Sequence, residues 1–266
     1  MHDLMGRRPL WVLRQVCVVT LGVVVYFGVR GLTESEPRLA VDHAHDLLSF
    51  ERALGLDQEQ RLQALLHGRD WLADLANWVY IWGHWPVIGL VLLWLGLRHR
   101  VLFLRLRNAM IASGLVGLLV FATYPVAPPR LVDLGLIDTV TQRSHAYRVL
   151  QPPAFVNQYA ALPSLHVGWD LLVGLTVAAA AGGALLRWIG RLMPLLMAAA
   201  VVLTANHYLI DGVAGAALAL VGLAVAVTWE RRAPAAATTH PGVQIPRPRA
   251  APQDAPLQAR DRARSA

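Results

Sequence analysis

The chain has 266 residues, of which 56% are hydrophobic and only 15% are charged. This composition is more apolar and less charged than that of a soluble domain, so it excludes an ordinary soluble protein and indicates an integral membrane protein. All 24 basic residues are arginine, and much of the net charge of +7 lies in short loops and a tail. Arginine in such places fixes topology and contacts anionic lipid, so we expect the lipid bilayer, and no nucleic acid, as a partner.

Residues 1–32 are predicted to form a cytoplasmic N-terminus and a first membrane span. Arg7, Arg8 and Arg14 precede or open the apolar run 16–29, a pattern that a signal peptide also shows. The small-residue cleavage site of such a peptide is poorly matched here, and the next segment begins with charge. We therefore predict that the span is retained.

Residues 33–68 are too charged to span a membrane and are predicted to form an extracytoplasmic amphipathic hairpin on the outer surface. Pro37 suits the start of a first helix, and Gly55 suits its end. Asp57 with Gln60 is typical of a capping box that opens a second, shorter helix. Three histidines in this hairpin are expected to be solvated: His43, His45 and His67.

Five further apolar runs approach the length of about 20 residues that a bilayer requires, so the sequence predicts an all-α protein with about six membrane spans. These runs are 71–97, 110–124, 165–186, 192–207 and 210–229. Arginines gather in the connections on the side of the N-terminus, at 98–107, 187–191 and 231–232. The positive-inside rule then predicts that both termini are cytoplasmic.

The predicted membrane domain comprises 69–232. Its candidate catalytic residues are all predicted to lie on the side of the membrane opposite the N-terminus. Residues 233–266 are rich in Pro, Ala and Arg without periodicity, which predicts a disordered cytoplasmic tail.

The use of arginine alone, together with much alanine, is typical of a GC-rich genome. We therefore expect an integral protein of a bacterial plasma membrane.

The stretch 157–166, Asn-Gln-Tyr-Ala-Ala-Leu-Pro-Ser-Leu-His, joins a polar segment to an apolar helix. Ser164 is a good N-cap for that helix, and His166 lies in its first turn. The unpaired N–H groups of a helix N-terminus attract anions, phosphate in particular. The sequence therefore predicts an anion site beside His166, with Asn157 as a further polar ligand.

A second stretch, 206–211, joins the last two apolar runs and contains His207 and Asp211. Residues four apart share one face of a helix, so this carboxylate can orient this imidazole. A neutral imidazole is nucleophilic near pH 7, and a second histidine can protonate a leaving group. With Arg130 as a bidentate phosphate ligand, these side chains predict a phosphoryl-transfer site at the membrane surface.

Three segments resemble, in this order, motifs of the type 2 phosphatidic acid phosphatase superfamily. They are Tyr-Pro-Val-x-Pro-Pro-Arg ending at Arg130, Ala-x-Pro-Ser-x-His ending at His166, and Ala-Asn-His-Tyr-x-x-Asp ending at Asp211. The closer resemblance is to the inositolphosphotransferase branch, typified by fungal inositol phosphorylceramide synthase. The resemblance implies a helical bundle without cofactor or metal. It also implies that His207 is the nucleophile, Asp211 its orienting partner and His166 the acid.

The chain departs from the phosphatase pattern in two places. The Ser-Arg pair expected upstream of His207 is replaced by the apolar stretch 200–204, and the lysine of the first motif is absent. Phosphate binding must then rest on Arg130, on Arg143 or Arg148, and on the helix N-terminus at Ser164. This departure favours the transferase branch.

Other interpretations remain open at this stage. The histidines and Asp211 can be structural or can bind a metal, and Arg130 can be a topological anchor. The leading hypothesis is a phosphotransferase that acts on membrane lipid phosphate esters at the extracytoplasmic face, through a phosphohistidine, and moves a phosphoinositol-like head group. The alternatives are a lipid phosphate or polyprenyl phosphate phosphatase, a non-catalytic lipid-binding or transport protein, and a metal-dependent hydrolase.

Overall fold

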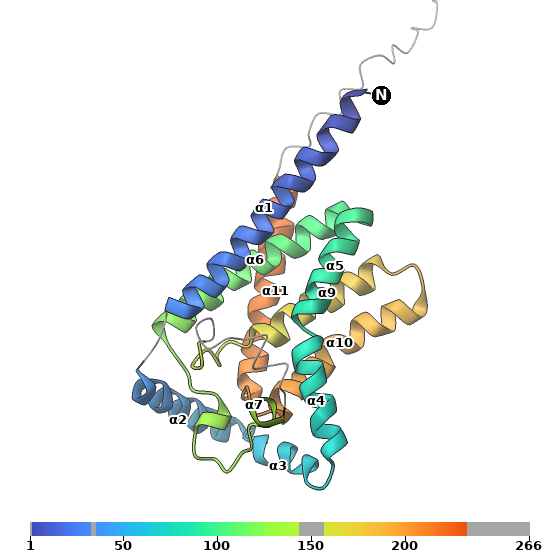
Figure 1. Ribbon diagram of the computed structural model, residues 1–266. Helices are drawn as coiled ribbons and strands as arrows, with labels where there is room; N and C mark the ends of the chain where they lie inside the picture. The colour runs from blue at the N-terminus through green and yellow to red at the C-terminus, as the bar shows by residue number, and fades with distance from the viewer. Residues whose placement is uncertain (1, 33–35, 144–156, 233–266) are drawn as a thin grey trace, which may run out of the picture. The chain divides into compact units, whose positions relative to one another are not determined.

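Helices make up nearly all of the regular structure in the computed structural model, which describes residues 2–32, 36–143 and 157–232 (Figure 1). Within these ranges no strand is present, and one isolated parallel bridge pairs Val126 with Ala160. Arg148 and the predicted C-terminal tail lie outside the described residues. The all-α class predicted from the sequence is confirmed.

Four described helices are long and apolar enough to cross a membrane, and a bent pair makes a fifth span if its two helices are counted together. The four are α1 (His2–Leu32), α6 (Arg100–Thr123), α10 (Ala184–Leu203) and α11 (Leu209–Arg232). The bent pair is α4 (Asp70–Trp82) with α5 (Trp85–Arg98). The remaining run, predicted as a span over 165–186, is a shorter apolar helix, α9 (Leu165–Ala180).

Several arginines predicted to lie in loops lie on helices instead. Arg105 and Arg107 belong to α6, because arginine is a good helix former and its long side chain reaches polar partners from a helix surface. Arg105 Nε lies 2.9 Å from Glu230 Oε2 near the end of α11, and Arg107 donates to Gln15 of α1. Likewise, Arg187 lies in the first turns of α10, and the turn before this helix is shorter than predicted.

The second span is broken between α4 and α5, and the two helices meet at an angle of 44°. Pro86 explains the break, because it has no N–H to donate to the carbonyl of Trp82 four residues earlier. Gly83 and His84 therefore lie at the break rather than inside a continuous helix. The break turns His84 towards α9, where its side chain is buried.

The hairpin region contains α2 (Pro37–Leu54), α3 (Glu59–Gln63) and a 3-10 turn (Ala64–Leu66). As predicted, α2 begins at Pro37 and ends at Gly55, whose φ of 69° is in the left-handed region. The apolar face of α2 packs on the connections before α9 and α11. The cluster contains Ala40, Ala44 and Leu48 with Val126, Ala127, Val132, Ala161 and Tyr208.

Two predictions for this region are wrong. His43 is not simply solvated, because its Nδ1 lies 2.8 Å from Pro125 O and its ring stacks on Tyr124. Asp57 does not cap the second helix; its carboxylate lies 3.6 Å from Arg52 Nε, while Gln58 is the N-cap residue of α3 without a side-chain cap. A contact between residues far apart in the sequence decides the first case, and a local contact with the end of α2 decides the second.

Helix α9 packs against α10 and α11, and α11 also packs against α6 (Figure 1). Glycines allow the closest approach of α9 to α11. A Cβ atom at Gly215 would lie 2.0 Å from Ser164 O, and one at Gly168 would lie 2.4 Å from Gly215 O. The N-terminal ends of α9 and α11 are therefore held side by side, each next to one of the sequence motifs.

Two short elements lie between α6 and α9: a 3-10 turn (Pro129–Leu131) and α7 (Thr139–Arg143). The 3-10 turn follows the proline-rich segment predicted to be non-helical, and it carries Arg130. α7 packs on α4, where Asn77 and Thr139 exchange two hydrogen bonds. These contacts hold the loop beside the motif ends of α9 and α11.

Candidate active site

A backbone hydrogen bond links the two helix ends that carry the motifs. Ser164 N donates to Asp211 O over 2.9 Å, which fixes the start of α9 to the start of α11. Ser164 Oγ accepts from Val167 N at 3.4 Å, so Ser164 is the N-cap of α9 as its sequence position predicts. Because the Ser164 side chain is buried in this capping role, it faces the helix and does not line the cavity described below.

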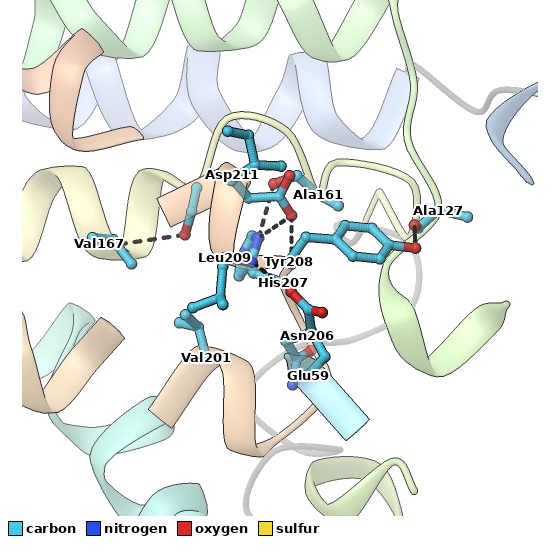
Figure 2. A network of polar contacts seen from close by, with 12 residues as sticks. Glu59, Ala127, Ala161, Val167, Val201, Asn206, His207, Tyr208, Leu209 and Asp211 are labelled. Atoms are coloured by element: carbon cyan, nitrogen blue, oxygen red, sulfur yellow. Dashed lines mark hydrogen bonds and ion pairs between the residues drawn. The ribbon is translucent and has the colours of Figure 1, made fainter. Parts of the chain in front are cut away.

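His207 lies in the turn before α11, and its ring is oriented from one side by the backbone (Figure 2). His207 Nδ1 lies 2.8 Å from Ala161 O and 3.4 Å from Asp211 Oδ2. A carbonyl oxygen can only accept a hydrogen bond, so in the neutral ring Nδ1 carries the proton and Nε2 keeps its lone pair. This is the tautomer that a histidine nucleophile requires.

The predicted orienting role of Asp211 is shared with Ala161. Asp211 is fully buried, and its Oδ2 also accepts from Tyr208 N at 2.9 Å, which caps the first turn of α11 (Figure 2). The carboxylate thus lies beside the Nδ1 side of the His207 ring and holds the turn that carries it. In this position it stabilises a positive charge on the ring.

The turn at 204–207 has an unusual backbone conformation. Ala205 has a φ of 54°, in the left-handed region that costs a residue with a Cβ atom roughly 1 kcal/mol. Both Asn206 N and His207 N donate to Val201 O, at 3.0 and 3.2 Å. These bonds hold the strained turn in place, so the backbone presents His207 in one orientation.

His166 lies in the first turn of α9, and its ring centroid is 5.7 Å from that of His207. On other sides its ring stacks on Tyr80 at 4.6 Å and lies 4.3 Å from the ring of His84. The structure therefore brings together the two histidines that the sequence motifs single out. Both rings line the same cavity, so one bound group can contact both of them.

Arg130 is tied to the same turn. Its Nη1 donates to Asn206 Oδ1 at 2.6 Å, its Nε lies 3.3 Å from Asp138 Oδ2, and its backbone N donates to Ala205 O. The side chain is only 11% exposed, so the guanidinium is held in position before any substrate arrives. The carboxylate of Asp138 balances part of the positive charge of the guanidinium. The guanidinium also lines the cavity described below, where it can bind an anion.

A polar cavity lies between the two histidines and Arg130. Asn157 also lines it and holds the loop before α9, because its Oδ1 accepts from Tyr159 N at 2.9 Å. Of the predicted site residues, Asp211 and Ser164 lie behind the cavity wall, and Arg148 lies outside the described residues. The remaining lining residues are Tyr26, Tyr80, Phe121, Pro128, Gln158, Ala160, Ala161, Leu165 and Asn206.

A family model described as the PAP2 superfamily matches residues 45–225, which is more than half of the chain. The chain belongs to the PAP2 superfamily. No curated protein and no solved structure matches it. The matched range contains all three motifs and both histidines, so the superfamily predicted from them is confirmed, and the protein is a membrane enzyme with an activity of the lipid phosphate phosphatase or phosphotransferase type.

Several residues that line the cavity of this PAP2 protein were not indicated as site residues by the sequence motifs. Tyr26 comes from α1, and Tyr80 comes from α4. Both lie in apolar runs, where an aromatic residue is ordinary and gives no functional signal. Asn206 lies inside the third motif, next to His207, and this position could have indicated that it belongs to the site.

In the stretch 200–204, which replaces the Ser-Arg pair of the phosphatase pattern, Ala200 and Val201 are buried among apolar side chains. The carbonyls of these two residues accept hydrogen bonds from the 204–207 turn. This position therefore supplies backbone acceptors that shape the turn, and it offers no side-chain charge to a phosphate. Arg130 is the cationic side chain that lines the cavity within the described residues.

Two glutamates of the hairpin region contact the first turn of α11. Glu59 Oε1 accepts from Leu209 N at 2.9 Å, and Glu51 Oε1 accepts from Ile210 N at 2.8 Å. Burial, together with the negative charges of Glu59 and Asp211, raises the pKa of Glu51 to about 8, although the hydrogen bond from Ile210 acts in the opposite direction. The hairpin therefore holds α11 through buried carboxyl groups. The sequence predicted 33–68 as a charged segment on the outer surface and did not indicate these contacts.

Metal binding was one of the alternatives for this site. Among the residues that the structure describes, no group of three or more His, Cys, Asp or Glu side chains is arranged to hold a metal ion. Within this part of the PAP2 fold, the polar side chains that line the cavity include the guanidinium of Arg130, the two imidazoles and the amide of Asn157.

Proposed function

We propose that the enzyme transfers a phosphorus-containing group from a membrane lipid through a covalent intermediate on His207. The observation that carries this proposal is the 2.8 Å contact of His207 Nδ1 with Ala161 O, which leaves Nε2 as the free nucleophile. In the first step Nε2 attacks phosphorus, a P–N bond forms, and the P–O bond to the leaving alcohol breaks. His166 donates its proton to the leaving oxygen.

The second step returns the enzyme to its starting state. A hydroxyl group attacks phosphorus, His166 takes its proton, and the P–N bond to His207 breaks. The same intermediate serves a transferase or a phosphatase, because the attacking group is an alcohol in the first case and water in the second. Atoms and protons balance over the two steps in either case.

Charge on the phosphoryl oxygens is stabilised by groups that are already in place. Arg130 is held by Asn206 and Asp138, so little reorganisation is needed when phosphate binds. The N-terminus of α9 adds its partial positive charge on the side of His166. We assign Asn157 to the head group of the lipid, because it lines the cavity beside Arg130.

We place the site at the extracytoplasmic face of the membrane, with both termini in the cytoplasm. The support is the distribution of arginine, which is dense at 98–107 and recurs at 187–191 and 231–232. A cysteine introduced at Thr141 should react with an impermeant reagent in intact cells, and one introduced at His99 should not. The reverse labelling pattern contradicts this orientation.

We infer that the transferred group is a phosphorylated head group of the phosphoinositol kind and that the acceptor is a lipid alcohol. Two features support transfer over hydrolysis: the apolar stretch 200–204 in place of the Ser-Arg pair, and the packing of α2 on the connections before α9 and α11. A covered site limits access of water to the intermediate. The alternative is hydrolysis of a lipid phosphate or polyprenyl phosphate.

A donor phospholipid labelled in its head group tests this inference. Purified enzyme in vesicles that contain lipid alcohols should convert the label into a new lipid. Label that appears only as free phosphate or free head-group phosphate, across a broad panel of alcohols, would instead identify a phosphatase. The matched control is His207→Ala, which should form neither product.

A further inference from the structure

A second buried histidine–carboxylate pair lies beside the candidate site. His84 Nδ1 is 2.9 Å from Asp170 Oδ1, and the two side chains are only 3% and 2% exposed. His84 comes from the break between α4 and α5, and Asp170 lies on α9, four residues after His166. Neither residue belongs to the three sequence motifs.

The pair is in contact with the proposed acid. The ring of His84 lies 4.3 Å from the ring of His166 by centroids, and on its other side it stacks on Trp169. Among the described residues, titratable side chains that contact the His166 ring include Tyr80 from α4, His84 from the helix break and His207 from the turn before α11. Asp170 adds a carboxylate directly behind His84.

Helix packing alone gives a poor explanation of this pair. Ionisable groups between apolar helices are costly, and apolar side chains would join α4, α5 and α9 without that cost. The chain also breaks a membrane span at the residue that supplies the imidazole. Together with the ring contact, both features place an oriented His–Asp pair against His166.

We propose that His84 and Asp170 position His166 and favour its protonated form, so that it can donate a proton to the leaving oxygen. This inference rests on the proposed function. The carboxylate accepts from His84 Nδ1 and fixes that ring, and the ring in turn limits the orientations open to His166. The negative charge of the pair stabilises a positive charge on His166.

The roles of the two pairs are therefore complementary. Asp211 and Ala161 O act on His207, the nucleophile, and Asp170 acts through His84 on His166, the acid. During the first step the proton moves from His166 to the leaving oxygen, and during the second it returns from the attacking hydroxyl. His84 and Asp170 exchange no proton with the substrate, so they are positioning residues.

Leaving groups of different basicity test this role. An alkyl phosphate ester needs a proton on its leaving oxygen, whereas a nitrophenyl ester leaves without one. Asp170→Asn keeps the shape of the side chain and removes its charge. We expect kcat/KM, which reports the first step alone, to fall by about 10-fold to 100-fold for the alkyl ester and to stay nearly unchanged for the nitrophenyl ester; the loss is at or below the lower end of the about 10²–10⁴-fold that removal of a general acid costs.

Two further variants keep the test decisive. His84→Gln should show the same dependence on the leaving group, and it substitutes for Asp170→Asn if that variant does not fold. Asn77→Ala is the matched control, because Asn77 is a buried polar residue of the same broken span whose side chain pairs with Thr139. It should not change the ratio of the two kcat/KM values.

The possible outcomes separate this inference from the proposed function. Equal losses on both esters, or full activity on the alkyl ester, overturn the positioning role while the wild type remains active. Wild-type protein that cleaves neither ester and transfers no head group overturns the proposed function, and the inference falls with it. His166→Ala should reproduce the leaving-group pattern of Asp170→Asn with a larger loss.

Discussion

The two histidines of the site are held by different parts of the molecule. His207 is held by a strained turn, by a backbone carbonyl and by carboxyl groups at the start of α11, two of which come from the hairpin region. His166 is held by rings from α4 and from the break before α5. The nucleophile is thus fixed largely by the backbone, and the acid is fixed by side chains.

This difference suits the two proposed tasks. A nucleophile has to keep one tautomer and one direction of attack, which a carbonyl acceptor and a rigid turn provide. An acid has to gain and lose a proton in each cycle, and neighbouring ionisable rings can respond to that change. Substitutions around His207 should therefore act on bond formation to phosphorus, and those around His166 should act on departure of the leaving group.

The largest effect is expected from His207→Ala. This variant removes the proposed nucleophile, so turnover and any acid-labile phosphoenzyme should both be lost. Incorporation of label from a lipid donor labelled at phosphorus measures both. The exposed His45→Ala is the matched control and should retain wild-type values. Near-normal turnover in His207→Ala would exclude His207 as the nucleophile.

A smaller effect is expected from Asp211→Asn. Because Ala161 O already fixes the proton on His207 Nδ1, the tautomer should persist and mainly the charge of the carboxylate is lost. We expect kcat to fall by about 10-fold to 100-fold, because a hydrogen bond to a charged group contributes about 1.5–3 kcal/mol. Steady-state kinetics in detergent measure this. A loss as complete as that of His207→Ala would mean that Asp211, and not the carbonyl, controls the tautomer.

The junction between the two halves of the site is tested by Gly215→Ala. The added Cβ atom would lie 2.0 Å from Ser164 O, so α11 must move away from the N-terminus of α9. We expect a loss of about 1–3 kcal/mol in the free energy of unfolding, as for other overpacked positions, together with reduced activity. Thermal unfolding of the purified protein measures the first quantity.

Gly212→Ala is the matched control for this substitution. Its Cβ atom would meet Val167 Cγ2 at 3.6 Å, an ordinary van der Waals contact. Stability should therefore change little. If Gly215→Ala is as stable and as active as Gly212→Ala, close contact between the two helix ends is not what brings His166 to His207.

The smallest effect concerns Glu51, whose pKa burial raises to about 8. A carboxyl group with a raised pKa binds its proton more tightly in the folded protein, so its contribution to stability is present at low pH and is lost as pH rises through that value. Between the unfolded value of 4.5 and the folded value of about 8 only the folded state holds this proton, so the melting temperature should fall from about pH 4.5 to about pH 8. Glu51→Gln should flatten this part of the profile, and the exposed Glu36→Gln should not. A slope unchanged in Glu51→Gln would contradict the raised pKa.

The sequence predicted the helical class, the superfamily and the two motif ends because these depend on local patterns. Apolar length indicates spans, and the spacing of His207 and Asp211 indicates a shared helix face. Helix boundaries were less predictable. Arginine within α6 was taken as loop, because its pairing with Glu230 near the end of α11 leaves no trace in the local sequence.

Support for the site from distant segments was least predictable. Glu51 and Glu59 contact the backbone of α11 across about 150 positions of sequence, and a charged helix face looks the same whether or not it does so. His84 is a lone histidine in an apolar run, a pattern that does not indicate its pairing with Asp170 of another helix. Its contact with His166 depends on the bend between α4 and α5, which only the three-dimensional structure contains.

The most direct test is to locate the covalent phosphorus on the trapped enzyme. Phosphoenzyme quenched under alkaline conditions, with histidine labelled by nitrogen-15, distinguishes the two ring nitrogens by NMR, and peptide mass spectrometry identifies the residue. Because Nδ1 is held by Ala161 O, phosphorus should be on Nε2 of His207. Phosphorus on Nδ1 of His207, on His166, or on no residue during active turnover would contradict the mechanism.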